Sequence, residues 1–292
     1  MEEIRKLKLP KSFDEQLEIL LKHNMIIEDR DKAIDILNKV NYYRFNGYAL
    51  RFKKNNRYIE GTTFGKIHSI YQFDKSLRHS LMEALEIIEI SLRTSIEYNL
   101  AQKHGSEAHL NQTIFVNKRY HAEFVACLTK ELERNSKELF VKHHIINYNN
   151  KFPIWVVLEL SSFGTLSKMY KNLVVPEQKV ISKHFCNLNY SLLTGGIYHL
   201  SYVRNICAHH NRIYDKNLRI LPKLHKKYDK YEIDKTKIFA SILVIKEFLL
   251  YRNKAEWDMF HIKIESLIEE YEGIINLESI GFKTEWREIL NL

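Results

Sequence analysis

The sequence predicts an all-α protein: a helical bundle with a small N-terminal attachment. The chain has only 4 prolines and 9 glycines in 292 residues, and these are the residues that most often interrupt helices. A long run of apolar residues recurs at helical spacing, whereas no segment shows sustained alternation of apolar and polar residues. We divide the chain into an N-terminal attachment, residues 1–60, and a helical domain, residues 61–292.

The N-terminal attachment begins with a helix whose start is marked by a capping box. Ser12 precedes Glu15 by three positions, and the apolar side chains of FDEQLEILLKH follow. A second short helix is expected over about residues 31–40. Together these elements predict a small helical unit ahead of the main bundle.

A stretch rich in aromatic and basic residues follows, NYYRFNGYALRFKKNNRY at residues 41–58. We expect a turn or a short hairpin here. Interleaved aromatic and basic side chains suit contact with RNA bases and phosphates. Burial of the aromatic rings with the charges left in water explains the pattern equally well. The candidate RNA contacts are Arg44, Arg51, Lys53, Lys54 and Arg57.

The strongest helical signal runs over residues 63–103 and predicts the central helix of the fold. Its apolar positions follow the spacing of one helix face: Leu77, Leu81, Ala84, Leu85, Ile88, Leu92 and Ile96. Gly105 is a natural stop. Glu89 and Arg93, four apart, lie at the edge of this stripe. They are either an exposed pair that contributes little or half-buried supports of a site.

Shorter helices are expected after the central one. We place them at about residues 118–142, from Pro153 onward, over SFGTLSKMYKNL, over PEQKVISKHF, and at about residues 190–210, 236–251 and 255–271, with a short helix in the tail. Gly195 and Gly196 lie inside one of these helices, which predicts close packing of its backbone. An irregular basic connector, NRIYDKNLRILPKLHKK, follows that helix.

Composition bounds the class of protein. The formal charge is +9, from 45 Lys and Arg against 36 Asp and Glu, which suits a polyanionic partner such as nucleic acid. Cys127, Cys186 and Cys207 are far apart and odd in number, so neither a disulfide framework nor a zinc ribbon is predicted. The N-terminus does not resemble a signal peptide, and no apolar run is long enough to cross a membrane. We therefore expect a cytoplasmic protein without a membrane partner.

The stretch RNICAHHNRIYD, residues 204–215, holds the most reactive groups of the chain. On an ideal helix Arg204 and His209 point about 140° apart, whereas Asn205 and His209 share a face. Asn205 can therefore orient His209. If Asn211 stops the helix, both histidines lie on its last turn, where the helix dipole favours a cationic imidazole.

These groups suit cleavage of RNA without a metal or other cofactor. The neighbouring 2′-hydroxyl acts as nucleophile, His209 moves a proton, and Arg204 stabilises the charge on the phosphate. His210 and Tyr214 are weaker supports, and Arg212 is a further candidate RNA contact. A zinc site from His199, Cys207, His209 and His210 is an alternative whose spacing matches no usual pattern. Because the motif occurs once, two chains would have to join their motifs in a symmetric dimer.

Several stretches of the sequence resemble a known family. RNICAHHNRIYD is similar to the Arg-Asn-x-x-x-His signature of HEPN-type ribonucleases. The stretches NYYRFNGYALRF, FDKSLRHSLMEALEIIEISLRTSIEYNLA and PIWVVLELSSFGTLSKMY, together with that helix, resemble the Abi-like proteins of bacterial abortive infection, of the AbiD and AbiF kind. In order, they cover roughly residues 14–250.

The resemblance implies a HEPN-like helical bundle that dimerises and brings two motifs to a shared cleft. It places the catalytic pair on Arg204 and His209, with Asn205 as the polar residue after the arginine. It implies a role as a toxin or growth-arrest factor in anti-phage defence, and a small structured non-coding RNA as a further partner. Two other functions remain open: a non-catalytic RNA-binding protein, and a helical interaction protein without nucleic acid. Cleavage of RNA separates the first function from the second, and steep salt dependence of RNA binding separates both from the third.

Overall fold

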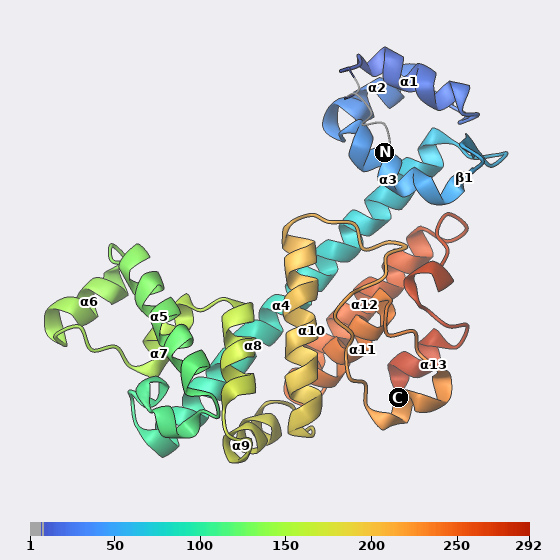
Figure 1. Ribbon diagram of the computed structural model, residues 1–292. Coiled ribbons are helices and arrows are strands. Elements are labelled where there is room, and N and C mark those ends of the chain that lie inside the picture. Colours follow the sequence, from blue (N-terminus) through green and yellow to red (C-terminus); the bar gives the residue numbers. More distant parts are fainter. Residues whose placement is uncertain (1–6, 8) are drawn as a thin grey trace, which may run out of the picture. The chain divides into compact units, whose positions relative to one another are not determined.

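The computed structural model describes residue 7 and residues 9–292 (Figure 1). It confirms an all-α protein, because a two-stranded hairpin is the only sheet in the described chain. The described chain divides into two compact units. The smaller holds the N-terminal residues to Ser76 together with Leu267–Asn276, and the larger holds Leu77–Ser266 and Leu277–Leu292. None of the described helices is long and apolar enough to span a membrane.

The smaller unit is built from short, well-capped helices. These are α1 (Phe13–Lys22), α2 (Arg30–Lys39), α3 (Tyr42–Ala49) and the first turns of α4 (Phe64–His104). The expected capping box is present: Glu15 N–H donates to Ser12 Oγ at 3.2 Å, and Ser12 N–H donates to Glu15 at 2.7 Å. Polar side chains also cap the next two helices, Asp29 for α2 and Asn41 for α3.

The expected turn in the basic stretch is a hairpin. Strand β1 (Lys53–Lys54) pairs antiparallel with β2 (Arg57–Tyr58). Asn55 and Asn56 connect them, with φ of 51° and 61°. A type I′ hairpin turn needs this left-handed backbone at both positions, and asparagine tolerates it better than most residues. The turn therefore explains the adjacent asparagines.

Helix α4 is the long central helix, and its expected apolar stripe lies in the core. All seven apolar positions from Leu77 to Ile96 named above are buried. The helix ends at His104, and Gly105 adopts φ of 85°, the left-handed conformation of a helix stop. Glu89 and Arg93 lie in the part of α4 that belongs to the larger unit.

The other helices of the larger unit are shorter. They are α5 (Lys118–Arg134), α6 (Leu139–Asn147), α7 (Ile154–Val157), α8 (Phe163–Asn172), α9 (Val175–Cys186), α10 (Tyr190–Ala208), α11 (Ile238–Leu249), most of α12 (Lys254–Glu270) and α13 (Trp286–Asn291). The single helix expected at residues 118–142 is two helices. Asn135 ends α5, where its side-chain amide donates to Glu131 O at 2.7 Å and competes with continued helix.

Helix α10 packs against α8, α9 and α11 and carries the motif. Gly196 faces Val244 and Phe248 of α11 so closely that a β-carbon would collide with both side chains. The expected close approach of the backbone is therefore confirmed at this glycine. Substituting a larger residue would push α10 away from α11.

Candidate functional site

The motif lies where α10 ends, and its local structure is a Schellman motif. Helix α10 ends at Ala208, and His209 is its C-cap. His210 adopts φ of 54°; its N–H donates to Cys207 O at 2.9 Å, and Asn211 N–H donates to Ile206 O at 2.9 Å. The expectation that Asn211 stops the helix is wrong, because His210 takes the left-handed position usual for glycine or asparagine. Both histidines lie just beyond the last helical residue.

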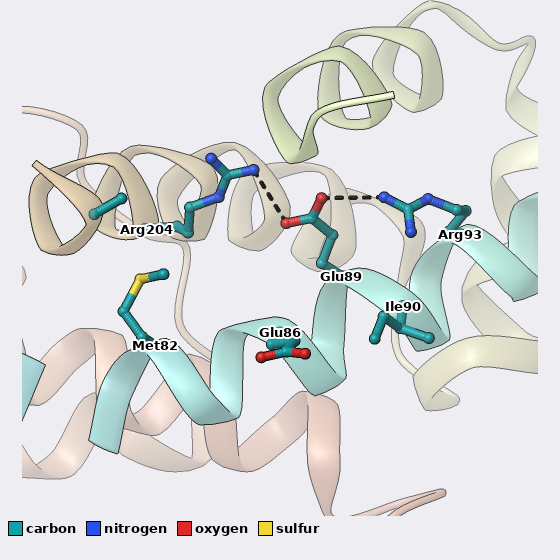
Figure 2. A pocket seen from close by; sticks show the side chains of 7 residues that line it. Met82, Glu86, Glu89, Ile90, Arg93 and Arg204 are labelled. Atoms are coloured by element: carbon teal, nitrogen blue, oxygen red, sulfur yellow. Dashed lines mark hydrogen bonds and ion pairs between the residues drawn. The ribbon is translucent and has the colours of Figure 1, made fainter. Parts of the chain in front are cut away.

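Arg204 is held by a carboxylate of the central helix. Its Nη2 donates to Glu89 Oε2 at 3.2 Å, and Arg93 Nη2 donates to Glu89 Oε1, also at 3.2 Å (Figure 2). The Glu89 and Arg93 side chains are only 15% and 10% exposed. They are therefore not the exposed surface pair that the spacing allowed. Each oxygen of Glu89 serves one guanidinium, so the carboxylate links α4 to α10.

Arg93 extends the network to the segment before α8. Its Nη2 also donates to Ser161 O at 3.0 Å, and its Nη1 lies 3.5 Å from Glu159 Oε2. Sequence reasoning missed Glu159 and Ser161 individually. The only signal was their place in PIWVVLELSSFGTLSKMY, one of the stretches that resemble the family.

Glu97, one helical turn beyond Arg93 on α4, was also missed. Burial raises the pKa of its carboxyl group to about 7; the negative charge of Glu159 adds to this shift and Arg93 opposes it. Its Oε2 is buried and makes no hydrogen bond to any described residue. A carboxyl group that titrates near neutral pH therefore lies next to the network. Strongly shifted carboxyl groups are frequent at functional sites.

An open pocket of about 320 Å³ lies between α4 and the end of α10. Figure 2 shows Arg204 on one side of it and Glu89 and Arg93 on the other. The volume lies at the small end of the range for ligand sites. Its lining mixes these charged groups with apolar side chains: Met82, Glu86, Glu89, Ile90, Arg93, Arg204 and Ala208.

Asn205 and His209 do not line this pocket. The Asn205 side-chain oxygen accepts a hydrogen bond from Arg204 Nη1 at 3.3 Å. No hydrogen bond joins the side chains of Asn205 and His209 in the described part of the chain. The two residues are joined only by the helical backbone bond, in which the His209 N–H donates to the Asn205 carbonyl oxygen at 3.1 Å. His209 is exposed at the helix end. The structure thus joins Arg204, Asn205, Glu89 and Arg93, and leaves His209 outside this network and exposed to solvent.

The remaining candidates fall into two groups. Tyr214 is buried and Arg212 half-buried in the segment that leaves α10. The candidate RNA contacts near the hairpin belong to the smaller unit. Four of these are exposed, while Lys53 is half-buried with its Nζ 4.6 Å from the centre of the Tyr58 ring. The exposed members are Arg44, Arg51, Lys54 and Arg57.

The structure argues against the zinc alternative. His199 is fully buried, its Nδ1–H donates to Ile220 O, and its Nε2 accepts from Ser241 Oγ at 2.8 Å. Burial lowers the pKa of this imidazole to about 4. Both ring nitrogens are engaged, so His199 is not available as a ligand. Among the described residues, no three His, Cys, Asp or Glu side chains are grouped to hold a metal.

Comparison with known proteins identifies the family. A model of the Abi-like proteins matches residues 35–215, well over half of the 292 residues. No curated protein and no solved structure matches the chain. The matched region contains the hairpin, all of α4 and the whole motif. Abi-like proteins take their name from abortive infection, so the match implies a role in bacterial anti-phage defence. The chain belongs to the Abi-like protein family.

Proposed function

We propose that this Abi-like protein is a metal-independent endoribonuclease of the HEPN type that acts in anti-phage defence. The observation that carries the proposal is the arrangement at the end of α10. There the Arg204 guanidinium is fixed by Glu89 at an open pocket, and His209 of the same motif is exposed at the helix end. An oriented arginine and a solvent-accessible imidazole are the two groups that cleavage of RNA without a metal requires.

Arg204 supplies the phosphate contact. A guanidinium has five N–H donors in a planar fork, and the hydrogen bonds of Arg204 to Glu89 and Asn205 use two of them. The side chain is 26% exposed, so its other donors can reach a phosphate oxygen. The positive charge on that fork stabilises the negative charge that builds on the phosphate in the transition state.

His209 moves the proton. The neighbouring 2′-oxygen of the RNA gives its proton to a base and attacks the phosphorus. The 5′-oxygen of the next nucleotide leaves and takes a proton from an acid. The products are a 2′,3′-cyclic phosphate and a 5′-hydroxyl. His209 is suited to either proton transfer, because one imidazole nitrogen can accept a proton while the other can donate one.

Two chains complete the site in this proposal. One chain supplies one motif, whereas the reaction needs both a base and an acid. The pocket of one chain also has little net charge, because Glu86 and Glu89 offset Arg93 and Arg204. A homodimer that joins two motifs supplies a second His209 for the other proton transfer and a second Arg204 for the phosphate.

The test is cleavage of a mixed RNA substrate by purified protein in EDTA. Wild type should cut, whereas Arg204→Ala and His209→Ala should not. The control is His143→Ala, which removes an exposed histidine of α6 outside the motif and should cut like wild type. Cleavage by His209→Ala at the wild-type rate would refute the assignment. Loss of cleavage on adding EDTA would refute the metal-independent mechanism.

A second candidate function is RNA binding without cleavage, with a small structured RNA as the bound partner. It is favoured by one observation: the Asn205 side chain is turned to Arg204 and not to His209, so the imidazole is not held for proton transfer. Prolonged incubation distinguishes the two functions. RNA that stays intact while bound to the wild-type dimer would support the binding function.

A further inference from the structure

One connector of the larger unit carries a strong net positive charge. Residues 209–237 join α10 to α11 and contain nine Lys or Arg and four Asp or Glu, a net charge of +5 out of +9 for the whole chain. We call this segment the basic connector. It begins at His209, so a segment with a net positive charge starts directly at the motif.

The basic connector is anchored to the larger unit and does not behave as a solvated loop. Six of its side chains are buried, and they recur along its length: Ile213, Tyr214, Leu218, Pro222, Tyr228 and Ile233. Leu218 N–H donates to Thr236 O at 2.7 Å, which ties the outgoing and returning parts of the connector together. An anchored backbone holds its charged side chains in a defined arrangement.

The outgoing part of the connector runs back along α10. Arg219 N–H donates to Tyr202 Oη at 3.3 Å, and Ile220 O accepts from His199 one helical turn earlier. Lys223 then lies against Gly195, one further turn back. These α10 positions are three and four residues apart, so they share one helix face. Figure 1 shows the segment leaving the end of α10 as an irregular loop.

His209 lies at one end of this path. Successive residues of a helix are turned by about 100° and rise about 1.5 Å, so position 209 lies on the same face of α10 as Gly195. The two positions are about 20 Å apart along the helix axis. Arg204, by contrast, points to the opposite side, toward Glu89 on α4. An RNA chain that follows the connector would therefore reach His209 first, and would then have to cross the end of α10 to reach the Arg204 pocket.

Three cations of the path are available to a ligand. Arg219, Lys223 and Lys226 are exposed, and no Asp or Glu of the described chain forms an ion pair with them. Other cations of the connector are already engaged: Lys227 with Glu247 at 2.7 Å and Lys237 with Asp215 at 3.9 Å. Unpaired, exposed cations beside a proposed RNA-cleaving residue are suited to phosphate groups.

We propose that the basic connector is the track that guides the sugar–phosphate backbone of single-stranded RNA to His209. The proposal rests on the proposed function, because it takes RNA as the substrate. The occupant is a single strand because attack by a 2′-oxygen requires a backbone free to align that oxygen with the leaving group. Contact through phosphates makes the track independent of base sequence.

The experiment measures binding separately from cleavage. All proteins carry His209→Ala so that the probe stays intact, and the probe is a fluorescent oligouridylate of about 12 nucleotides, within the site sizes of single-strand binders. One protein adds Arg219→Gln, Lys223→Gln and Lys226→Gln. The matched control adds Lys118→Gln, Lys130→Gln and Lys142→Gln, three exposed lysines of the larger unit outside the connector.

Binding constants are measured from about 50 to about 200 mM KCl. Each phosphate contact to a single strand contributes about 0.7 to the slope of log K against log salt. The connector variant should therefore lose about 2 units of slope and bind at least tenfold more weakly at low salt, whereas the control keeps the slope of its parent. Photocrosslinking of a 4-thiouridine probe to peptides of residues 209–237 in the parent protein is the second measurement.

The outcomes separate this proposal from the nuclease. An unchanged slope in the connector variant, an equal loss in the control, or crosslinks confined to other segments would overturn the track. Loss of slope in the connector variant alone, with no cleavage by wild-type protein, would support the track and refute the nuclease. If the parent does not bind the probe at all, the track is wrong.

Discussion

Glu89 is the residue whose removal tests the site most directly. Its two oxygens bind Arg204 and Arg93, and within the described chain no other carboxylate forms an ion pair with Arg204. We consider Glu89→Gln, which keeps the size of the side chain and one accepting oxygen. The substitution removes the negative charge and turns an N–H₂ group toward one of the two guanidinium groups.

The cost to stability follows from burial. A hydrogen bond to a charged group contributes about 1.5–3 kcal/mol, and breaking a buried ion pair costs about 3–5 kcal/mol. Here Arg93 keeps its bonds to Ser161 O and Glu159, and water can reach the partly exposed Arg204. We therefore expect Glu89→Gln to lower the free energy of unfolding by about 2 kcal/mol, below the full cost of a buried pair.

The effect on cleavage should be larger than the effect on folding. A misplacement of about 1 Å in a catalytic group costs about 100-fold in rate, and Glu89 is the group that aims Arg204. The assay combines urea unfolding with RNA cleavage for Glu89→Gln, Arg204→Ala and the double variant. If Glu89 acts through Arg204, Glu89→Gln should slow cleavage strongly alone and add nothing to Arg204→Ala.

The control lies on the same helix. Glu83 of α4 binds Lys263 at 2.6 Å, but the Glu83 side chain is 56% exposed. Exposed pairs contribute about 0–1 kcal/mol, so Glu83→Gln should leave both stability and cleavage nearly unchanged. The reasoning fails if Glu89→Gln behaves like Glu83→Gln, or if its effect on cleavage adds in full to that of Arg204→Ala.

Three further predictions concern other residues. Lys246 is 1% exposed, and burial lowers its pKa to about 8, so on raising the pH the folded protein loses this proton before the unfolded chain does. The free energy of unfolding should therefore rise by about 1 kcal/mol between about pH 7 and about pH 9. Lys246→Met should abolish that rise, as measured by urea unfolding. Glu97 should have the opposite effect on stability, because its raised pKa of about 7 favours the protonated carboxyl group in the folded protein. The free energy of unfolding should fall as pH rises from about 4.5 to about 7, and Glu97→Gln should remove that fall. Urea unfolding at both pH limits would show or refute this. His210 holds a left-handed backbone that costs about 1 kcal/mol outside glycine, so His210→Gly should raise the melting temperature and keep cleavage; loss of cleavage would show that His210, and not only His209, takes part in the reaction.

Helical periodicity predicted most of the fold because burial repeats along each helix. The stripe from Leu77 to Ile96 is a local signal, and so are Ser12 at a helix start and Gly105 at a helix end. Helix ends set by polar residues were harder to predict. The break at Asn135 and the end of α10 at Ala208 depend on hydrogen bonds that compete with the helix, and periodicity does not record them.

The site was predicted as a set of residues but not as a network. Arg204 and Glu89 are 115 positions apart, and no local pattern pairs them. Geometry on an ideal helix predicted that Asn205 faces His209. The expected side-chain pairing is absent because Arg204 donates to the Asn205 side-chain oxygen instead. Glu159 and Ser161 enter the network only through packing of the segment before α8 on α4, and Glu97 lies next to it on α4 itself.

The distribution of charge suggests that different residues determine RNA affinity and the rate of cleavage. The pocket holds two carboxylates against two guanidinium groups, so it offers an incoming phosphate little net attraction. The basic connector holds a net charge of +5 and three cations free of ion pairs within the described chain. In the proposed function, counterion release by those cations sets the salt dependence of RNA binding, while Arg204 and Glu89 act on the transition state. Glu89→Gln should therefore slow cleavage without changing the slope of log K against log salt, and the connector variant should do the reverse when RNA is saturating. A single variant that changes both the cleavage rate at saturating RNA and the slope of log K against log salt would show that binding and cleavage use the same cations.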